Sequence, residues 1–296
     1  MSPGRRGEAE ATPRKTRKPA RPLLVVDGDS FAHRAFHSMP RSVRRADGRP
    51  GNLLTGFTSM LVQLWKAEAP RAVVVGWDTL FVPTYRHELL PGYQAGREFD
   101  PELLEQLDLA PGMLTAGGIV CGTAPGYEAD DFLGAAVSAE RARGGRSLVA
   151  TSDRDAFQLV ADDVTIIQPV KGVSEVARIG PAEVRERYGV DPAQVTDFIA
   201  LRGDPSDKIP GARGVGTKTA AALIAEYGSL DALLDAGRFA AEAEALRAYR
   251  SIATFDTAAP LPPLPEQGPD WNAVASAAEE LGLARLASRV REVASS

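Results

Sequence analysis

Three short apolar runs, each ending in aspartate, constrain the fold of this chain more than any other feature. They are LLVVDGD at 23–29, AVVVGWD at 72–78 and SLVATSDRD at 147–155. None shows the polar alternation of a half-exposed strand, so each is typical of a strand buried on both faces. Helical patterns separate them, at 53–69, 101–118 and 128–145. This alternation predicts βαβ units and a mainly parallel α/β sheet flanked by helices.

The residues that close these runs are acidic. In a parallel α/β sheet the carboxyl ends of all strands lie on one edge, which is where ligands bind. We therefore expect carboxylates from distant parts of the sequence to meet there. A further acidic group follows the short apolar run at 119–122, in the stretch GYEADD. The expected set is Asp27, Asp29, Asp78, Asp153, Asp155, Glu128, Asp130 and Asp131.

So many like charges in one place require a counter-charge, because carboxylates within ~4–6 Å raise one another's pKa. GYEADD holds no lysine or arginine, and TSDRD holds only Arg154. Acidic residues in the first turn of a helix also suit the helix dipole, which accounts for one or two of the set but not for all. We therefore predict two divalent cations, the usual arrangement for cleaving phosphodiesters.

The donor atoms indicate which metal is expected. The set offers hard oxygen ligands without histidine or cysteine, which favours Mg²⁺ or Mn²⁺ over zinc. The three histidines, His33, His37 and His87, lack metal-motif spacing.

Composition sets wider limits. With 296 residues the chain can form one large domain or two smaller ones. The net charge of −5 argues only weakly against a nucleic-acid partner, because a cluster of metal-binding carboxylates makes a chain acidic while other faces stay basic. A single cysteine, Cys121, excludes an internal disulfide and suits a reducing cytoplasm. No apolar run approaches the ~18 residues of a membrane span, and no signal peptide is evident.

The two ends have distinct compositions. Residues 1–22 carry seven lysines and arginines among Pro, Gly and Ala, which predicts a disordered basic tail. This tail either has no dedicated role or attracts polyanions non-specifically. Near the other end, LPPLPEQGPD at 261–270 predicts a Pro-rich connector to a last helix at about 271–292.

From residue 180 to about 260 the composition is helical. Within it, GARGVGTKTAAALIAEYG is a Gly-rich turn leading into an apolar-periodic helix, a combination that can bind backbone phosphates. The expected contacts are Gly214, Gly216, Thr217, Lys218 and Thr219. The alternative is a tight helix–turn–helix without a ligand. Asp204 and Asp207, just upstream, are either further site residues or Asx-turn and N-cap residues.

Taken together, these motifs resemble the 5′-nuclease family: bacterial 5′–3′ exonucleases, the nuclease domains of bacterial DNA polymerase I, and flap endonucleases. The resemblance covers about 22–236 and rests on five segments in family order: LLVVDGDSFAHRAFH, WDTLFVPTYRHELLPGYQAGR, GYEADD, TSDRD and GDPSDKIPGARGVGTKTA. It implies a PIN-like domain at 23–179 with a helical arch at about 79–112, a helix–three-turn–helix DNA-binding subdomain at 180–260, and a free-standing form.

The resemblance also implies residue roles. Arg34, Arg97 and Asp27 would be catalytic, Arg86 and Arg97 would contact phosphates in the arch, and Tyr93 would stack on a base, worth ~1–3 kcal/mol. Gln94 stands where many members have a catalytic lysine, and Lys208 stands beside Asp207 where many have asparagine. K⁺ would sit at the Gly-rich turn. The implied metal ligands are Asp27, Asp78, Glu128, Asp130, Asp131, Asp153, Asp155, Asp204 and Asp207.

The implied function is metal-dependent 5′–3′ exonuclease and 5′-flap endonuclease activity on DNA ends, flaps and junctions, and on RNA–DNA hybrids, by a monomer in replication and repair. Three alternatives remain. One is a haloacid-dehalogenase-like phosphatase, because VVDGDS and GDPSD mimic its acidic motifs. The second is a DNA-junction-binding protein without activity. The third is an RNA-cleaving PIN-type nuclease, although such enzymes use fewer carboxylates.

Overall fold

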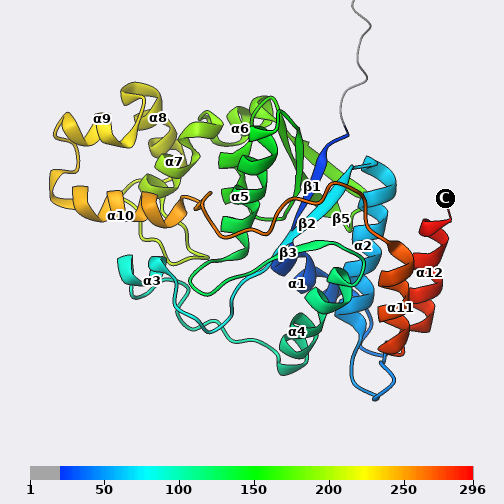
Figure 1. The fold of residues 1–296 in the computed structure, drawn as a ribbon. Helices are drawn as coiled ribbons and strands as arrows, with labels where there is room; N and C mark the ends of the chain where they lie inside the picture. The colour runs from blue at the N-terminus through cyan, green and yellow to red at the C-terminus, as the bar shows by residue number, and fades with distance from the viewer. Residues whose placement is uncertain (1–20, 296) are drawn as a thin grey trace, which may run out of the picture.

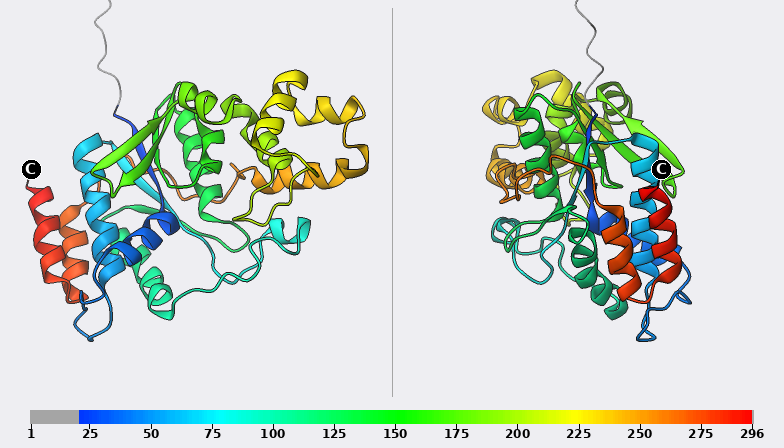
Figure 2. Two further views of the ribbon diagram at one scale, coloured as in Figure 1. Left: turned by 180° about the vertical axis from the view of Figure 1, so that it is seen from behind. Right: turned by 45° about the vertical axis from the view of Figure 1, so that its right-hand side comes forward.

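The computed structural model describes residues 21–295 (Figures 1 and 2). Its strands are β1 (Leu23–Asp27), β2 (Ala72–Gly76), β3 (Val120–Gly122), β4 (Ser147–Ala150), β5 (Val164–Lys171) and β6 (Glu175–Ile179). Its α-helices are α1 (Gly28–Ser38), α2 (Asn52–Glu68), α3 (Tyr85–Leu89), α4 (Pro101–Thr115), α5 (Ala129–Ala142), α6 (Pro181–Tyr188), α7 (Val195–Arg202), α8 (Thr217–Tyr227), α9 (Leu230–Asp235), α10 (Ala243–Ala253), α11 (Trp271–Glu280) and α12 (Ala284–Ala294).

One six-stranded sheet, in the order β3-β2-β1-β4-β5-β6, forms the centre of the molecule. Its first five strands pair in parallel, and β6 pairs antiparallel with β5. The mainly parallel α/β sheet is therefore confirmed. β1 lies inside the sheet, and all five of its residues are buried, as expected for an apolar run without polar alternation.

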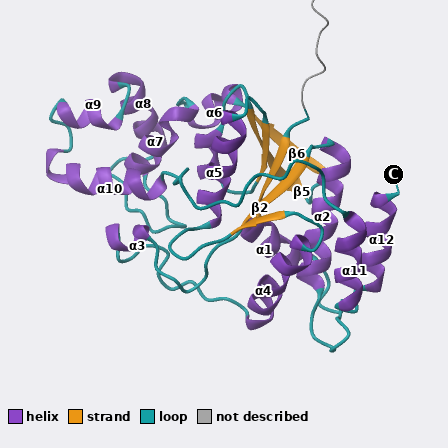
Figure 3. Ribbon diagram, viewed as in Figure 1, coloured by secondary structure: helices purple, strands orange, loops and turns teal. Residues whose placement is uncertain are grey.

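Helices cover both faces of the sheet (Figure 3). Leu24 and Val26 of β1 belong to a core cluster with α1, α2, α4, α11 and α12. Leu23 and Val25 point to the other face and join a cluster that includes residues of α5, α6 and α7. That second cluster continues into α8, α9 and α10, so the sheet and the C-terminal helical half share one core.

The helical half lies at one end of the molecule, with α8, α9 and α10 farthest from the sheet, and α11 and α12 lie at the opposite end beside α2 (Figure 1). After α6 the chain is helical apart from turns and connectors, as its composition indicated. The turn at 203–216 joins α7 to α8 and brings the helical half next to the carboxyl edge of the sheet.

Three parts of the chain differ from the sequence-based expectation. The arch segment (79–112) is only partly helical, because between β2 and α4 its one α-helix is the five-residue α3. The last helix is in fact two, α11 and α12, because Gly282 adopts a positive φ of 78° and reverses the chain. The strands β5 and β6 were not predicted; Pro169 interrupts the strand signal of β5 and coincides with a shift in the pairing register.

The predicted basic tail at 1–22 falls, apart from its last two residues, outside the described part of the chain. Within residues 21–295 there is no helix with both the length and the apolar character needed to cross a bilayer.

Candidate active site

A cavity of about 730 Å³ lies where the strands β1 to β4 end. Asp27 is the last residue of β1, Asp78 follows β2, and Asp153 follows β4. Glu128 precedes α5, and the turn between α7 and α8 contributes Asp204. Eight of the nine predicted metal ligands line this cavity: Asp27, Asp78, Glu128, Asp130, Asp153, Asp155, Asp204 and Asp207.

Local hydrogen bonds fix the strand-end aspartates. Asp27 is the N-cap of α1: its Oδ1 accepts from the Ser30 N–H at 2.9 Å, and its Oδ2 accepts from the Thr151 hydroxyl at 2.6 Å. Asp78 accepts from the Ala129 N–H at 2.8 Å, which ties the end of β2 to the first turn of α5. The loops that carry the acidic residues are therefore held to one another across the edge of the sheet.

The cavity has a large excess of negative side chains. Ten acidic residues line it, including Asp29 and Glu98 beyond the predicted ligands, against three arginines, Arg97, Arg154 and Arg202. Ion pairs join Arg97 to Asp207 at 3.0 Å and Arg202 to Asp204 at 2.9 Å. The place of Arg202 in the cavity was not predicted, because its contact with Asp204 depends on the conformation of the turn after α7 and no sequence motif marks it. Most of the negative charge stays unbalanced.

The excess charge is reflected in the acidities. Burial raises the pKa of Asp27 to about 7, and repulsion from Asp153 and Asp78 adds to the effect. Burial also raises the pKa of Glu128 to about 7. The pKa values of Asp130 and Asp155 are raised well above the usual range, first by burial and then by neighbouring carboxylates. Without a cation, this cavity favours protonated carboxyl groups.

The donor set fits hard divalent cations. All the acidic donors are carboxylate oxygens, the ligands that Mg²⁺ and Mn²⁺ prefer, and a bound cation would offset the repulsion that raises these pKa values. Within residues 21–295, however, no three acidic, histidine or cysteine side chains already form a closed metal-binding group. The carboxylates line an open cavity instead.

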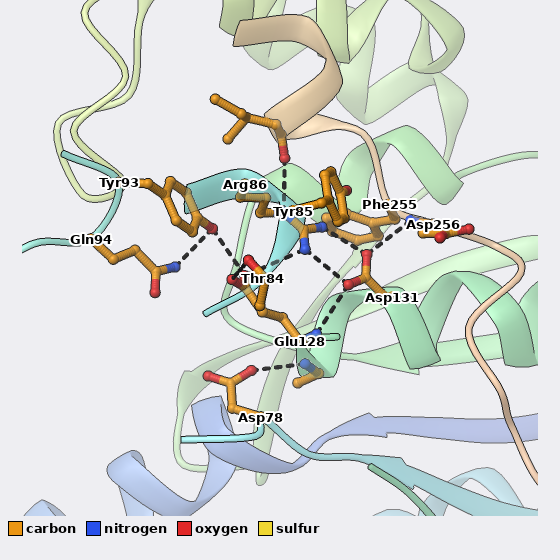
Figure 4. A network of polar contacts seen from close by, with 12 residues as sticks. Asp78, Thr84, Tyr85, Arg86, Tyr93, Gln94, Glu128, Asp131, Phe255 and Asp256 are labelled. Atoms are coloured by element: carbon orange, nitrogen blue, oxygen red, sulfur yellow. Dashed lines mark hydrogen bonds and ion pairs between the residues drawn. The ribbon is translucent and has the colours of Figure 1, made fainter. Parts of the chain in front are cut away.

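Asp131 corrects the predicted ligand set. It is fully buried, and both carboxylate oxygens accept from the Arg86 guanidinium, at 2.8 and 2.7 Å (Figure 4). It also accepts from the backbone N–H groups of Glu128 at 3.0 Å and Asp256 at 2.8 Å. Asp131 thus has its counter-charge from an arginine 45 residues away and does not line the cavity.

The same contact corrects the role of Arg86. Its side chain is 2% exposed, and its Nε donates to the Ile252 carbonyl at 3.0 Å. It therefore holds the arch segment against α5 and the end of α10, and it cannot reach a phosphate at the surface. No feature of the sequence distinguishes this arginine from a surface one, since burial and pairing are decided by the fold.

Tyr93 is also different from the expectation. It is 3% exposed, and its hydroxyl donates to Oε2 of Glu128 at 2.9 Å (Figure 4). Its ring edge-packs against His87, with centroids 5.3 Å apart. No face of this ring is open to a base, so the predicted stacking does not fit. Tyr93 supports a cavity carboxylate instead.

Gln94 and Lys208, the two departures from the family pattern, both join the arch segment to neighbouring parts of the site. Gln94 Nε2 donates to the Tyr93 hydroxyl at 2.8 Å and to Asp207 Oδ1 at 3.1 Å. Lys208 Nζ donates to the Ala95 carbonyl, so the arch segment is joined to the turn between α7 and α8 from both sides. Gln94 and Lys208 also share a positive φ, of 48° and 58°, which is unusual for residues other than glycine.

The remaining predicted residues lie around this centre. Arg97 lines the cavity, whereas Arg34 borders a neighbouring hollow and donates to Ser152 Oγ at 3.3 Å. The Gly-rich turn lies outside the cavity: Gly214 has a φ of 77°, and Gly216 is the N-cap of α8 without a side-chain cap. The five residues predicted to contact phosphates are all exposed, as is Arg213 in the same turn: Gly214, Gly216, Thr217, Lys218 and Thr219.

Two family models match consecutive parts of the chain, together residues 22–269. Residues 22–189 match the "5′-3′ exonuclease, N-terminal resolvase-like domain", and residues 190–269 match the "5′-3′ exonuclease, C-terminal SAM fold". The chain belongs to the 5′-3′ exonuclease family. This membership removes the haloacid-dehalogenase-like phosphatase from the alternatives, because the match includes every acidic segment of the cavity.

Relatives within the family are of two lengths. The chain is 46% identical over 215 residues to DNA polymerase I of Mycobacterium tuberculosis, covering 72% of this chain and 24% of that protein. It is 39% identical over 235 residues to a 5′-3′ exonuclease of the same organism, covering 73% of each. The chain therefore spans about a quarter of the length of its DNA polymerase I relatives.

The fold also matches solved structures. The flap endonuclease D15 of bacteriophage T5, in a complex with DNA and metal ions, superposes with a TM-score of 0.66 at 20% identity, covering 93% of this chain and 100% of that one. At this identity the likeness shows a shared fold, and it covers the sheet as well as the helical half.

Proposed function

We propose that this protein is a metal-dependent 5′–3′ exonuclease and 5′-flap endonuclease that hydrolyses DNA phosphodiesters in replication and repair. The observation that carries the proposal is the cavity lined by ten carboxylates at the strand ends, bordered by the turn that leads into α8. The relatives named 5′-3′ exonuclease and the T5 enzyme, whose complex holds DNA and metal ions, support it.

The eight cavity carboxylates predicted as ligands would hold two divalent cations, Mg²⁺ or Mn²⁺. When bound, such ions supply Lewis-acid activation of water and neutralise charge on the phosphate. Hydrolysis adds a water oxygen to phosphorus and breaks the P–O3′ bond, which leaves a 5′-phosphate and a 3′-hydroxyl. Catalysis without cations is not expected, since any carboxylates that are ionised without them would repel a phosphodiester and no Lewis acid would activate water.

The basic side chains of the protein would orient the substrate. Arg97 lines the cavity with its side chain 40% exposed, so it can turn from Asp207 toward a phosphate and neutralise charge that develops there. Arg154 also lines the cavity and is exposed. At the far side of the α7–α8 turn, the exposed N-terminus of α8 with Lys218 would bind the duplex backbone.

The decisive test replaces one strand-end carboxylate. Asp153→Asn should abolish Mg²⁺-dependent cleavage of a labelled 5′-flap duplex while binding to the same duplex persists. Asp163→Asn, at a partly exposed aspartate paired with Arg141 away from the cavity, is the matched control and should cleave normally. Unimpaired cleavage by the Asp153 variant would remove this residue from the site.

The choice of substrate tests the remaining alternatives. The wild-type protein should cut the flap duplex with Mg²⁺ and remain inactive in EDTA. Binding without cutting would favour the inactive junction-binding protein, and cutting of RNA alone would favour the RNA-cleaving nuclease. The further expectations of K⁺ at the Gly214–Gly216 turn, of RNA–DNA hybrid substrates and of a monomeric cytoplasmic enzyme rest on the family resemblance and belong to the same proposal.

A further inference from the structure

We propose that Phe81 and Phe99 form a pocket for an unpaired nucleobase, next to the carboxylate cavity. This inference rests on the proposed function, because it assigns a place to the nucleotide that follows the phosphate being cut. It concerns a second, smaller cavity of about 270 Å³ on the arch segment.

Exposed apolar side chains concentrate on the arch segment. Among the described residues, the large hydrophobic side chains that stand exposed are Phe81 at 79%, Val82 at 38%, Leu89 at 43% and Val170 at 57%. Three of the four belong to the arch segment, and Phe81 is the aromatic one. An exposed apolar group beside a functional cavity is a feature that marks a binding surface.

The backbone of Phe81 has a strained conformation. Its φ is +63°, a left-handed conformation that is strained for a bulky residue. Strained residues of this kind concentrate where a ligand or substrate is bound. The strain is not offset by burial of the ring, because the side chain remains in contact with solvent.

The geometry of the two rings suits a planar ligand. The Phe81 and Phe99 rings meet edge to face, with centroids 6.2 Å apart and planes at 89°. Two perpendicular rings form a corner, in which a flat ligand can stack on one ring while its edge meets the other. Leu80 and Val82 complete the apolar wall of this pocket.

The position of the pocket identifies the ligand class. It shares Asp78, Arg97 and Glu128 with the carboxylate cavity, so the two are continuous. A ligand that occupies both must therefore join an anionic group, held near Arg97 and the metal ligands, to an apolar planar group. A nucleotide has this chemistry. Stacking also accepts any base, which suits an enzyme that reads shape rather than sequence.

This proposal assigns base stacking to Phe81 instead of Tyr93, which lies in the same arch segment. Tyr93, the aromatic residue expected to stack, is buried and hydrogen-bonded to Glu128. Phe81 precedes it by twelve residues and is the ring that the fold leaves open. Tyr93 therefore positions a carboxylate, and Phe81 contacts the substrate.

The test compares flap substrates with and without the base at the first unpaired position. Wild-type cleavage under single-turnover conditions should fall on the abasic substrate by about 5- to 150-fold, the equivalent of ~1–3 kcal/mol at 1.4 kcal/mol per tenfold. Phe81→Leu, which keeps apolar bulk but removes the aromatic face, should cut the normal substrate as slowly as the wild type cuts the abasic one. Phe81→Trp, which keeps an aromatic face, should distinguish the normal substrate from the abasic one as the wild type does.

Val170→Leu is the matched control, at an exposed apolar residue of β5 outside both cavities. It should discriminate as the wild type does. If Phe81→Leu still distinguishes the two substrates by the wild-type factor, the pocket does not hold the base. If instead Phe81→Leu alters only the oligomeric state in sedimentation, Phe81 belongs to an interface between copies, and the proposal is overturned.

A binding measurement separates this inference from the proposed function. A flap with 2-aminopurine at the first unpaired position should lose fluorescence on binding to the wild type and keep it with Phe81→Leu. If the wild type cuts no substrate but quenches this base through Phe81, the pocket stands and the nuclease function fails. Equal quenching by both proteins would overturn the pocket while leaving cleavage unaffected.

Discussion

Replacing Arg86 with methionine removes the counter-charge of a carboxylate that has no access to water. Arg86 is 2% exposed and Asp131 is 0% exposed, and two hydrogen bonds of 2.8 and 2.7 Å join them. In Arg86→Met, Asp131 keeps its two backbone N–H donors but loses the cation. Breaking a buried ion pair from one side costs about 3–5 kcal/mol, a large share of the ~5–15 kcal/mol that stabilises a typical domain.

Arg141 provides a control that also makes two hydrogen bonds to one aspartate but is much less buried. It also binds an aspartate through two hydrogen bonds, of 2.7 and 2.9 Å to Asp163, but its side chain is 50% exposed and that of Asp163 is 30% exposed. Exposed ion pairs of this kind contribute about 0–1 kcal/mol. The difference between Arg86→Met and Arg141→Met therefore measures what burial adds to a bidentate ion pair, together with the hydrogen bond from Arg86 to the Ile252 carbonyl.

The assay is urea unfolding followed by far-UV circular dichroism, with the free energy of unfolding taken from midpoint and slope. We expect a loss of about 3–5 kcal/mol for Arg86→Met and at most about 1 kcal/mol for Arg141→Met. Equal losses would refute the reasoning. The double variant Arg86→Met/Asp131→Asn should regain much of the stability, because the uncompensated charge is gone while the amide carbonyl can still accept from a backbone N–H; if it does not, the lost charge balance is not the cause.

Three further predictions concern the cavity, the sheet and the duplex contact. In EDTA, thermal stability should fall as pH rises from about 4 to above 7. The reason is that Asp27 and Glu128, with pKa values of about 7, hold protons in the folded state that the unfolded chain releases at lower pH. Saturating Mg²⁺ should remove this dependence on pH, and a rise in stability with pH in EDTA would contradict the prediction. Gly28→Ala should lower the free energy of unfolding in urea by about 1–3 kcal/mol, because a Cβ at this position would lie 2.5 Å from the Gly76 carbonyl oxygen. Lys218→Ala should lower the salt slope of duplex affinity by about 1, and an unchanged slope would make the Gly-rich turn purely structural.

The strand-end carboxylates could be predicted because their signal is local. An apolar run without alternation predicts a buried parallel strand, and the rule that such strands end on one edge does not depend on the details of packing. Asp27, Asp78 and Asp153 therefore met as expected, although they come from three separate segments. The strand β5 escaped prediction because Pro169 and a shift in pairing register interrupt a pattern that the other strands show clearly.

The corrected residues share one physical cause. Asp131 follows Asp130 directly in a helical turn, and the two side chains point to different surroundings: Asp130 lines the cavity, whereas Asp131 is buried against Arg86. Charge counting within GYEADD could not reveal an arginine that the fold brings from 45 residues away. Tyr93 likewise has the residue type of a stacking contact, but its burial depends on how the arch segment packs against α5 and α10.

The sequence by itself therefore determined the class of sheet, the edge at which the acidic residues collect and the kind of ion that their oxygens favour, because each depends on residue type and on periodicity along the chain. Only the tertiary structure decided which carboxylate is neutralised internally and which faces the cavity, and it left Phe81 rather than Tyr93 as the open aromatic ring. Those outcomes depend on contacts between distant segments, and burial strongly changes the energy of a charge or a ring at a given position.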